Sequence, residues 1–455
     1  MASFIVTFTQ IIALVRKELL ALIKEPASRA LLIAPAFLQA LLYGYGATYD
    51  LTHVPYAVLD QSRSAASTEL LARIDGTGVF VRAATLTSPR QIAEMVEGKL
   101  EDLSDIMLPM KSAFAPNTLE TVSLYNDVAK KRAYYGFPLK QQSMHVQIWQ
   151  DMLEQAGFKQ SDIPTKWEDY WSFWCDKVQA ASRKATGQRI YAVGQPMGVE
   201  STDSFQSFYT FMDAHNVKLV DDDGKLLVDD PKVKENLTKA LKDYTDTYIK
   251  GCTPPSSTTW KDPDNNVAFH NKTIVMTHNA TISIAAKWLD DMNNATLTEA
   301  QRAQAKKNYT ELIATAGWPD KPDGSKFVYR AAVKTGVIFK AAKNTAAAKK
   351  FVAFMLDEAN LTPYVEGSLG RWFPVTKNAQ QSAFWKADPH RLAVYNQFMA
   401  GTVPFEFTKN WKFTILNNEN VWAKAMNRII NEKVPVPQAT DEMIARIKQV
   451  ASSTD

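Results

Sequence analysis

Residues 260–280 read WKDPDNNVAFHNKTIVMTHNA, and this stretch carries the features on which our fold assignment depends. The run TIVMTH at 273–278 is mostly apolar or β-branched, which predicts a buried strand. Asn279 follows it directly, and α/β sheets bind ligands beyond the carboxyl ends of their strands. We therefore expect an α/β fold with a polar binding site near Asn279.

Strands and helices alternate through the rest of the chain after residue 99. Gly157 ends one amphipathic pattern and Gly251 another, because glycine accepts the left-handed conformation in which many helices stop. Asp and Gly residues at 221–224 supply a turn between two extended segments. Helices are expected at 148–158, from 165 onward, at 232–249 and at 344–357, strands at 134–139, 190–193 and 220–226, and an extended segment at 367–376.

The composition is that of a globular protein. Of 455 residues, 46% are hydrophobic and 22% are charged, which excludes a disordered chain and fits two or three domains. The net charge of +4 makes no case for nucleic-acid binding, and the mean hydropathy of −0.24 excludes a polytopic membrane protein. With two cysteines, Cys175 and Cys252, a disulfide scaffold is excluded. The pair can bond in an oxidising compartment, although the Trp-rich helix around Cys175 favours a buried free thiol.

One membrane-spanning helix is predicted near the N-terminus. No charged residue occurs in the 20 residues from Ala30 to Tyr49, which cover about 30 Å as a helix, enough to cross a bilayer. Lys and Arg at 16, 17, 24 and 29 precede this run, so the positive-inside rule places residues 1–29 in the cytoplasm. A buried core helix is the alternative. Residues 4–25 are amphipathic, and we expect them to lie on the inner membrane surface rather than to form a cleavable signal peptide.

Residues 54–97 predict a small parallel-sheet unit. Residues 54–60 and 79–86 have strand patterns, and Gly76 and Gly78 end the helical pattern between them. Ser88-Pro89 is typical of the start of a second helix. Partial substitution of this β-α-β-α unit for strands of the following domain is the alternative to an incomplete lobe there, and it predicts that residues 54–60 pair into the same sheet as residues 134–139.

The segment RKELLALIKEPASRALLIAPAFLQALLYGYGATYDLTHVPYAVLDQSRSAAS, residues 16–67, resembles the start of an ATP-binding-cassette type-2 exporter permease. The resemblance covers about residues 5–100. It implies an inner-face helix, a first transmembrane helix and an external domain that opens with a strand. Such permeases need several more transmembrane helices, and no second uncharged apolar run of 18 residues follows here. This chain therefore cannot complete a transport channel by itself.

Six segments occur in a characteristic order after residue 99. They are YGFPLKQQS (135–143), AGFKQSDIPTKWEDY (156–170), DDDGKLLVDDP (221–231), residues 260–280, AAAKKFVAFML (346–356) and GRWFPV (370–375). With these segments, residues 99–450 resemble the extracellular solute-binding proteins, of the large sugar-binding group, that serve ATP-binding-cassette importers. This resemblance implies a bilobed α/β fold of the periplasmic-binding-protein type II class, in which crossing hinge segments join two lobes around a solute. The first quarter of such proteins has no counterpart here, so we predict an incomplete N-terminal lobe and a chimera of two transporter sequences joined near residue 99.

Side chains suited to sugar hydroxyls occur in several loops and at strand ends. Amide and guanidinium groups form multidentate hydrogen bonds, and the C–H faces of pyranoses stack on indole rings. Ordinary packing, solvated amides and surface salt bridges are the alternatives. Trp167, Trp171 and Trp174 have helical spacing and are interpreted as core. The predicted ligand-binding residues are Gln141, Gln142, Trp260, Asn279, Arg371 and Trp372.

Catalysis and metal binding are not predicted. The histidines at 145, 215, 270, 278 and 390 lack metal-ligand spacing, and the sequence contains neither a P-loop nor a nucleophile elbow. Residues 262–266 are only loosely similar to a calcium loop, because its glycine and final glutamate are missing. We therefore expect a binding protein and not an enzyme, with no catalytic residue, metal or cofactor.

The sequence thus predicts a solute-binding protein on the outer face of the cytoplasmic membrane. The expected partners are a carbohydrate-like solute, the transmembrane subunits of an importer, and the membrane itself through residues 30–49, and nucleic acid is not expected. A component of a type-2 exporter permease and a nonfunctional fusion product are the alternatives, and the ligand's identity stays open. The predicted domains are residues 1–29 (cytoplasmic amphipathic helix), 30–49 (transmembrane helix), 50–98 (permease-like external segment) and 99–455 (two-lobed solute-binding domain).

Overall fold

The computed structural model describes residues 14, 16, 17, 54–59, 80–86, 98–126 and 128–453. The chain divides into two units, residues 1–92 and 93–455. Leu14, Arg16 and Lys17 are helical and exposed. The transmembrane helix predicted at 30–49 lies outside the described residues. Within the described part of the chain, no helix is long and apolar enough to span a bilayer.

The first unit contains a two-stranded parallel sheet. It is formed by β1 (Val54–Leu59) and β2 (Phe80–Leu86), with a register shift between Tyr56 and Ala57. The two strands and their parallel pairing agree with the predicted β-α-β-α unit. The two helices of that prediction lie outside the described residues.

The predicted pairing of residues 54–60 with strands near 134–139 is wrong for the strands that the structure describes. β5 (Phe137–Gln142) pairs with β11 (Ala332–Gly336) along one edge. On the other edge, the backbone of Gln141 exchanges two hydrogen bonds with Phe373. β1 and β2 form a two-stranded sheet of their own, and β5 belongs to a different two-stranded sheet with β11.

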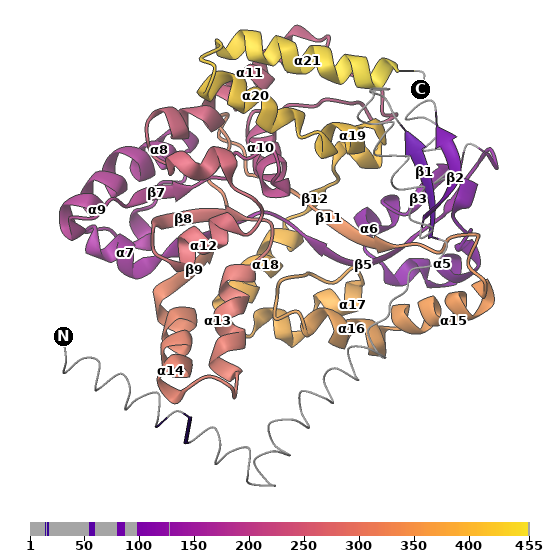
Figure 1. The fold of residues 1–455 in the computed structure, drawn as a ribbon, viewed down its shortest axis with the longest axis horizontal. Helices are drawn as coiled ribbons and strands as arrows, with labels where there is room; N and C mark the ends of the chain where they lie inside the picture. The colour runs from indigo at the N-terminus through magenta and orange to yellow at the C-terminus, as the bar shows by residue number, and fades with distance from the viewer. Residues whose placement is uncertain are drawn as a thin grey trace. The chain divides into compact units, whose positions relative to one another are not determined.

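The second unit contains two lobes, which we define as residues 98–142 with 331–399 (first lobe) and residues 145–330 with 400–453 (second lobe). The first lobe has two short antiparallel pairs, β3–β4 and β5–β11, and most of its helices lie near β5 in Figure 1. Its remaining elements are α5 (Ser104–Met110), η1 (Lys111–Ala113), α6 (Pro116–Glu120), β3 (Ser123–Asn126), β4 (Lys131–Tyr134), α15 (Thr345–Leu356), α16 (Glu358–Glu366), α17 (Lys377–Gln380), η6 (Ala383–Lys386) and α18 (Pro389–Met399).

A four-stranded sheet forms the centre of the second lobe. Its order is β7 (Tyr191–Gly194), β8 (Ile274–Asn279), β6 (His145–Trp149) and β9 (Ile313–Ala316). β7 and β8 are parallel, whereas β6 runs antiparallel to both β8 and β9. Every residue of β6 and β8 is buried, as expected for central strands.

Residues 148 and 149 are the end of β6, although the sequence predicts helix from 148 onward. The indole Nε1 of Trp149 donates to the carbonyl oxygen of Phe269 at 2.7 Å, and the two rings stack with their centroids 5.1 Å apart. These contacts and the pairing with β9 hold Trp149 in the sheet. The helix begins only at Gln150.

Helices pack around this sheet, and α10, α11, α20 and α21 form a neighbouring group at the top of Figure 1. α11 agrees with the predicted helix at 232–249, because Asp230 caps its start and Gly251 follows its end with φ of 69°. The helices of the second lobe are α7 (Gln150–Gln155), η2 (Gln160–Asp162), α8 (Trp167–Ser172), η3 (Phe173–Val178), α9 (Gln179–Thr186), α10 (Thr202–Ala214), α11 (Pro231–Ile249), η4 (Pro255–Thr259), α12 (Asp264–His270), α13 (Ser283–Asn293), α14 (Glu299–Lys307), η5 (Asn308–Leu312), η7 (Glu406–Thr408), α19 (Lys412–Asn418), α20 (Val421–Ile430) and α21 (Val436–Ser452).

The tryptophans at helical spacing belong to the core, as predicted. Trp167 and Trp174 are buried, and Trp171 packs against the same cluster. The expectation of a free thiol at Cys175 is wrong, because it forms a disulfide with Cys252, with 5.0 Å between the Cα atoms. The π-helical turn η3 carries Cys175 to the segment that leaves α11, where Cys252 lies.

The chain passes between the lobes near residues 142–145, 329–332 and 399–405, in agreement with the crossing segments that the sequence predicts. Two of these crossings pair with each other as short parallel strands, β10 (Tyr329–Arg330) and β12 (Thr402–Val403). The boundary between the lobes is thus built from strand segments far apart in sequence.

Candidate functional site

One edge of the four-stranded sheet gathers polar side chains. The strand registers place His145 opposite Asn279, Val146 opposite Ala316, and Gly194 opposite Thr277. The carboxyl ends of β7, β8 and β9 and the start of β6 therefore meet at this edge. It is also where the chain arrives from the first lobe, which makes it the place where both lobes can contact one ligand.

Asn279 is the last residue of β8, where the sequence places it at a strand end. Its amide Nδ2 donates to Asn266 Oδ1 at 2.7 Å and to Ser283 Oγ at 2.8 Å. These partners lie in α12 and at the start of α13. Amides and hydroxyls of this kind can donate and accept hydrogen bonds, which suits the hydroxyl groups of a sugar.

A carboxylate pair, Asp203 and Asp262, lies at the start of α10, and it is not among the predicted ligand-binding residues. Asp262 accepts hydrogen bonds from Ser201 Oγ at 2.9 Å, from Thr202 Oγ1 at 2.7 Å and from the backbone N–H of Asp203 at 3.2 Å. Burial, followed by the negative charge of Asp262, raises the pKa of Asp203 to about 7. Only the DPDNN run around Asp262 could have pointed to it.

His145 stands at the same edge, in register with Asn279. Burial lowers the pKa of His145 to about 4, against a smaller opposing effect of Gln397. His278, which precedes Asn279 in β8, has its pKa lowered to about 3 by burial. Both imidazoles are therefore neutral at pH 7, and the edge of the sheet offers neutral hydrogen-bonding groups.

The two predicted glutamines lie on opposite faces of β5. Gln141 is 1% exposed, and its amide donates to the carbonyl of Pro374 at 2.7 Å and accepts from Asn117 at 3.2 Å. Gln142 donates instead to Gln206 Oε1 of α10 at 3.2 Å. Gln142 therefore links the first lobe to the second, whereas Gln141 binds within the first lobe.

Arg371 and Trp372 lie in a loop of the first lobe that adjoins the second. A Cβ atom on Gly370 would come within 2.8 Å of Ile282 Cδ1, so this loop lies against the segment that follows Asn279. The ring of Trp372 has Lys140 Nζ at 4.6 Å and Lys334 Nζ at 5.5 Å from its centroid. Arg371 Nη1 donates to the carbonyl of Ser368 at 3.2 Å.

Trp260 directly follows η4. It is 6% exposed, its Nε1 donates to Ser256 Oγ at 3.1 Å, and its carbonyl group lies directly against Gly198. The structure thus brings Gln141, Gln142, Arg371 and Trp372 together and places Asn279 near them across the lobe boundary. Contact of any of these residues with a ligand stays a prediction.

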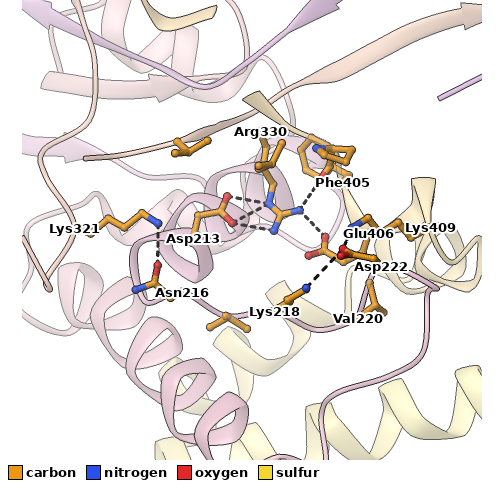
Figure 2. Close-up of a pocket in the computed structure, with 14 residues that line it drawn as sticks. Asp213, Asn216, Lys218, Val220, Asp222, Lys321, Arg330, Phe405, Glu406 and Lys409 are labelled. Carbon is orange, nitrogen blue, oxygen red and sulfur yellow. Dashed lines mark hydrogen bonds and ion pairs between the residues drawn. The ribbon is translucent and has the colours of Figure 1, made fainter. Parts of the chain in front are cut away.

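A separate cavity of about 450 Å³ lies between the end of α10 and the crossing strands. Figure 2 shows the guanidinium of Arg330 between Asp213 and Glu406, with Lys218, Lys321 and Lys409 around them. Burial raises the pKa of both carboxylates, and the facing guanidinium offsets this only in part. None of the six predicted ligand residues lines this cavity.

Metal-ligand clusters are absent from the part of the chain that the structure describes. No group of three or more His, Cys, Asp or Glu side chains there could hold a metal ion. The arrangement of amides, hydroxyls, an indole and cations is suited to holding a polar molecule.

A family model described as bacterial extracellular solute-binding protein matches residues 83–393. The chain belongs to this family. It is a solute-binding protein and not an enzyme, in agreement with the expectation from sequence.

Solved structures of such proteins share the bilobed α/β fold. An ABC transporter solute-binding protein from Thermotoga lettingae, bound with α-D-tagatose, is 15% identical with a TM-score of 0.62, covering 88% of this chain and 100% of that one. The maltose-bound MalE3 of T. maritima is 14% identical, with a TM-score of 0.60 and coverages of 88% and 100%. A sugar transporter protein from Arthrobacter chlorophenolicus with bound laminaribiose is 13% identical, with a TM-score of 0.58 and coverages of 88% and 99%.

A different likeness involves membrane proteins. The "Probable multidrug ABC transporter permease YbhR" of Escherichia coli K12 is 33% identical over 90 residues, which are 20% of this chain and 24% of the permease. The same protein of E. coli O157:H7 matches equally. The chain thus spans about a quarter of the length of the curated relatives it matches.

Proposed function

We propose that this solute-binding protein binds a sugar or other carbohydrate-like solute outside the cytoplasm and delivers it to the transmembrane subunits of an ATP-binding-cassette importer. The observation that carries the proposal is the meeting of amides and an indole at the lobe boundary of a chain from this family. The tagatose, maltose and laminaribiose bound by proteins of the same fold support the choice of ligand class.

Gln142, Asn279 and Trp372 form the centre of the proposed site. The two amides satisfy hydroxyl groups and the indole covers an apolar sugar face. Arg371, Gln141 and Trp260 complete the proposed set. Arg371 would contact the ligand through its guanidinium group, and Gln141 and Trp260 would lie near the walls of the sugar site. Closure of the two lobes would be driven by the ligand's higher affinity for the closed state.

The proposed location is the outer face of the cytoplasmic membrane. The 20 uncharged residues at 30–49 would be the single anchor, with residues 1–29 inside and the main domain outside. The Cys175–Cys252 disulfide supports an oxidising compartment for that domain.

We further propose that the chain is a chimera of a permease start and a solute-binding protein whose first lobe is incomplete. The likeness to YbhR over 90 residues supports this origin, together with the permease-like sequence at 16–67. The same likeness favours a second candidate function, a component of a type-2 exporter permease. Co-purification with exporter rather than importer subunits would favour that second function.

Thermal unfolding of the full chain against a panel of sugars and polyols tests the proposal. A ligand at 1,000 times its Kd should raise the free energy of unfolding by about 4 kcal/mol. Trp372→Ala and Asn279→Ala should abolish the shift, while Asn293→Ala, an exposed asparagine of α13, should preserve it. No shift with any sugar would contradict the proposal and favour a nonfunctional fusion product.

A further inference from the structure

Two lysines face each other across the β5–β11 pair. The strand register places Lys334 directly opposite Lys140. Both ammonium groups lie near the ring of Trp372, at 4.6 Å for Lys140 and 5.5 Å for Lys334. Lys140 Nζ also donates to the hydroxyl of Tyr364 at 3.1 Å. The result is a pair of like charges against an aromatic wall.

No carboxylate neutralises this pair among the described residues. Neither lysine forms an ion pair there, and Arg371, which adjoins Trp372, donates only to a backbone carbonyl. The nearby acid Glu366 accepts a hydrogen bond from Ser382 at 2.7 Å instead. Two ammonium groups thus lie against one indole without an anionic partner among the described residues, and Arg371 adjoins that indole in the sequence.

Such an arrangement is unfavourable in the absence of an anion. Like charges directly opposite in a sheet destabilise it, and attraction to the aromatic rings offsets this only in part. A carboxylate or phosphate between Lys140 and Lys334 would remove the repulsion. The planar fork of Arg371 could add two hydrogen bonds to the same group.

The lysine pair also lies beside the proposed sugar site. Lys140 and Gln142 are two residues apart on β5, so their side chains share a face of the strand. Gln142 contacts Gln206 of the second lobe, and Gly370 brings the Trp372 loop against Ile282. An anionic group bound by the lysines would therefore belong to a ligand held at the lobe boundary.

We propose that the ligand is an acidic carbohydrate, with a carboxylate or phosphate group bound by Lys140, Lys334 and Arg371 around Trp372. This inference rests on the proposed function and narrows its ligand class. Lys334 is exposed and Lys140 is half-buried, so both ammonium groups are open to an incoming solute.

Calorimetric titration of the full chain in detergent micelles tests the inference with matched pairs of ligands. The pairs are galacturonic acid with galactose, trigalacturonic acid with galactotriose, and glucose 6-phosphate with glucose, so that carboxylate and phosphate are distinguished. We expect one acidic member to bind at least roughly tenfold tighter than its neutral partner, because hydrogen bonds to charged groups are worth more than neutral ones. Its affinity should fall as salt is added.

Lys140→Gln and Lys334→Gln should each lower the affinity for the acidic ligand roughly tenfold. Both variants should unfold at or above the wild-type temperature, since each removes a repulsion, so lost binding cannot reflect misfolding. Lys225→Gln, which changes an exposed lysine of the 221–226 turn, is the matched control and should bind normally. If the neutral sugars bind as tightly as their acidic partners and the lysine substitutions do not change the affinity, the inference is overturned and the proposed function still stands. Absence of binding by every member of all three pairs would overturn both.

Discussion

The guanidinium of Arg330 donates three hydrogen bonds to the carboxylate of Asp213, from Nε to Oδ2 and from Nη2 to Oδ1 at 2.8 Å each, and from Nε to Oδ1 at 3.0 Å. Nη1 donates to Glu406 at 2.8 Å and to the carbonyl of Pro404 at the same distance. Arg330 lies in the crossing strand β10, Asp213 near the end of α10, and Glu406 just beyond β12. One buried cation therefore fastens two of the crossings between the lobes to the second lobe.

Arg330→Met should lower the free energy of unfolding by about 3–5 kcal/mol, because it leaves two buried carboxylates without their cation. Urea unfolding monitored by tryptophan fluorescence measures the loss. The matched control is Arg428→Met, whose partners Glu432 and Glu442 are exposed, and its effect should stay within about 1 kcal/mol. Equal losses in the two variants would contradict a structural role for the buried triad.

The raised pKa of Asp203 leads to a prediction of how the free energy of unfolding depends on pH. Its pKa of about 7 in the folded protein exceeds the ordinary value of 3.8, so the folded state binds more protons than the unfolded state between these values. The free energy of unfolding should therefore decrease as pH rises from about 4 to about 7, by on the order of 4 kcal/mol from this group. Below pH 4 the contribution is complete, and above pH 7 it is lost.

Asp203→Asn removes this titration while keeping a similar shape. The variant should match the wild type near pH 4 and become progressively more stable than it up to pH 7, as measured by urea midpoints across the range. Asp223→Asn, at an exposed position of the 221–224 turn, should follow the wild type at every pH. Parallel curves for wild type and Asp203→Asn would show that the carboxyl of Asp203 stays ionised.

Local patterns were sufficient to predict several parts of this fold. The run before Asn279 is a strand because its apolar and β-branched residues are buried, and α11 begins and ends at its cap and its glycine. Features that depend on distant partners could not be predicted in this way. Trp149 joins a strand because β8 and β9 pair with β6, and the Lys140–Lys334 pair exists only through the register of β5 with β11.

In the candidate site too, some features follow from the local sequence and others depend on partners that are distant in the chain. The position of Asn279 at a strand end follows from its own segment, whereas its approach to Trp372 depends on the packing of Gly370 against Ile282. Arg330 contacts a carboxylate 117 positions away in the chain, so no local motif marks it. For Cys175, the Trp-rich helix around it favours a free thiol, whereas the disulfide depends on η3 lying close to the segment that follows α11.

The disulfide should contribute substantially to stability. Cys175 and Cys252 are 77 positions apart, and closing a loop of that length restricts the unfolded chain by about 4 kcal/mol in the entropic model. The Cys175→Ser/Cys252→Ser double variant should therefore lose about 2–4 kcal/mol in urea unfolding. Wild type treated with a reductant should show the same loss, and reductant should leave the double variant unchanged. Equal stability of the oxidised and reduced wild type would contradict the prediction.

Gly198 should tolerate no side chain, because it packs against the backbone of Trp260. A Cβ atom there would lie 2.0 Å from the carbonyl oxygen of Trp260, and a backbone group cannot move aside as a side-chain end can. Gly198→Ala should therefore cost about 2–3 kcal/mol in urea unfolding and displace Trp260, changing its fluorescence. Gly194→Ala is the matched control, since its Cβ would meet the flexible end of Ile274 at 2.1 Å, and its loss should be smaller. A larger loss for Gly194→Ala than for Gly198→Ala would show that the Trp260 loop can move, and with it the wall of the proposed site.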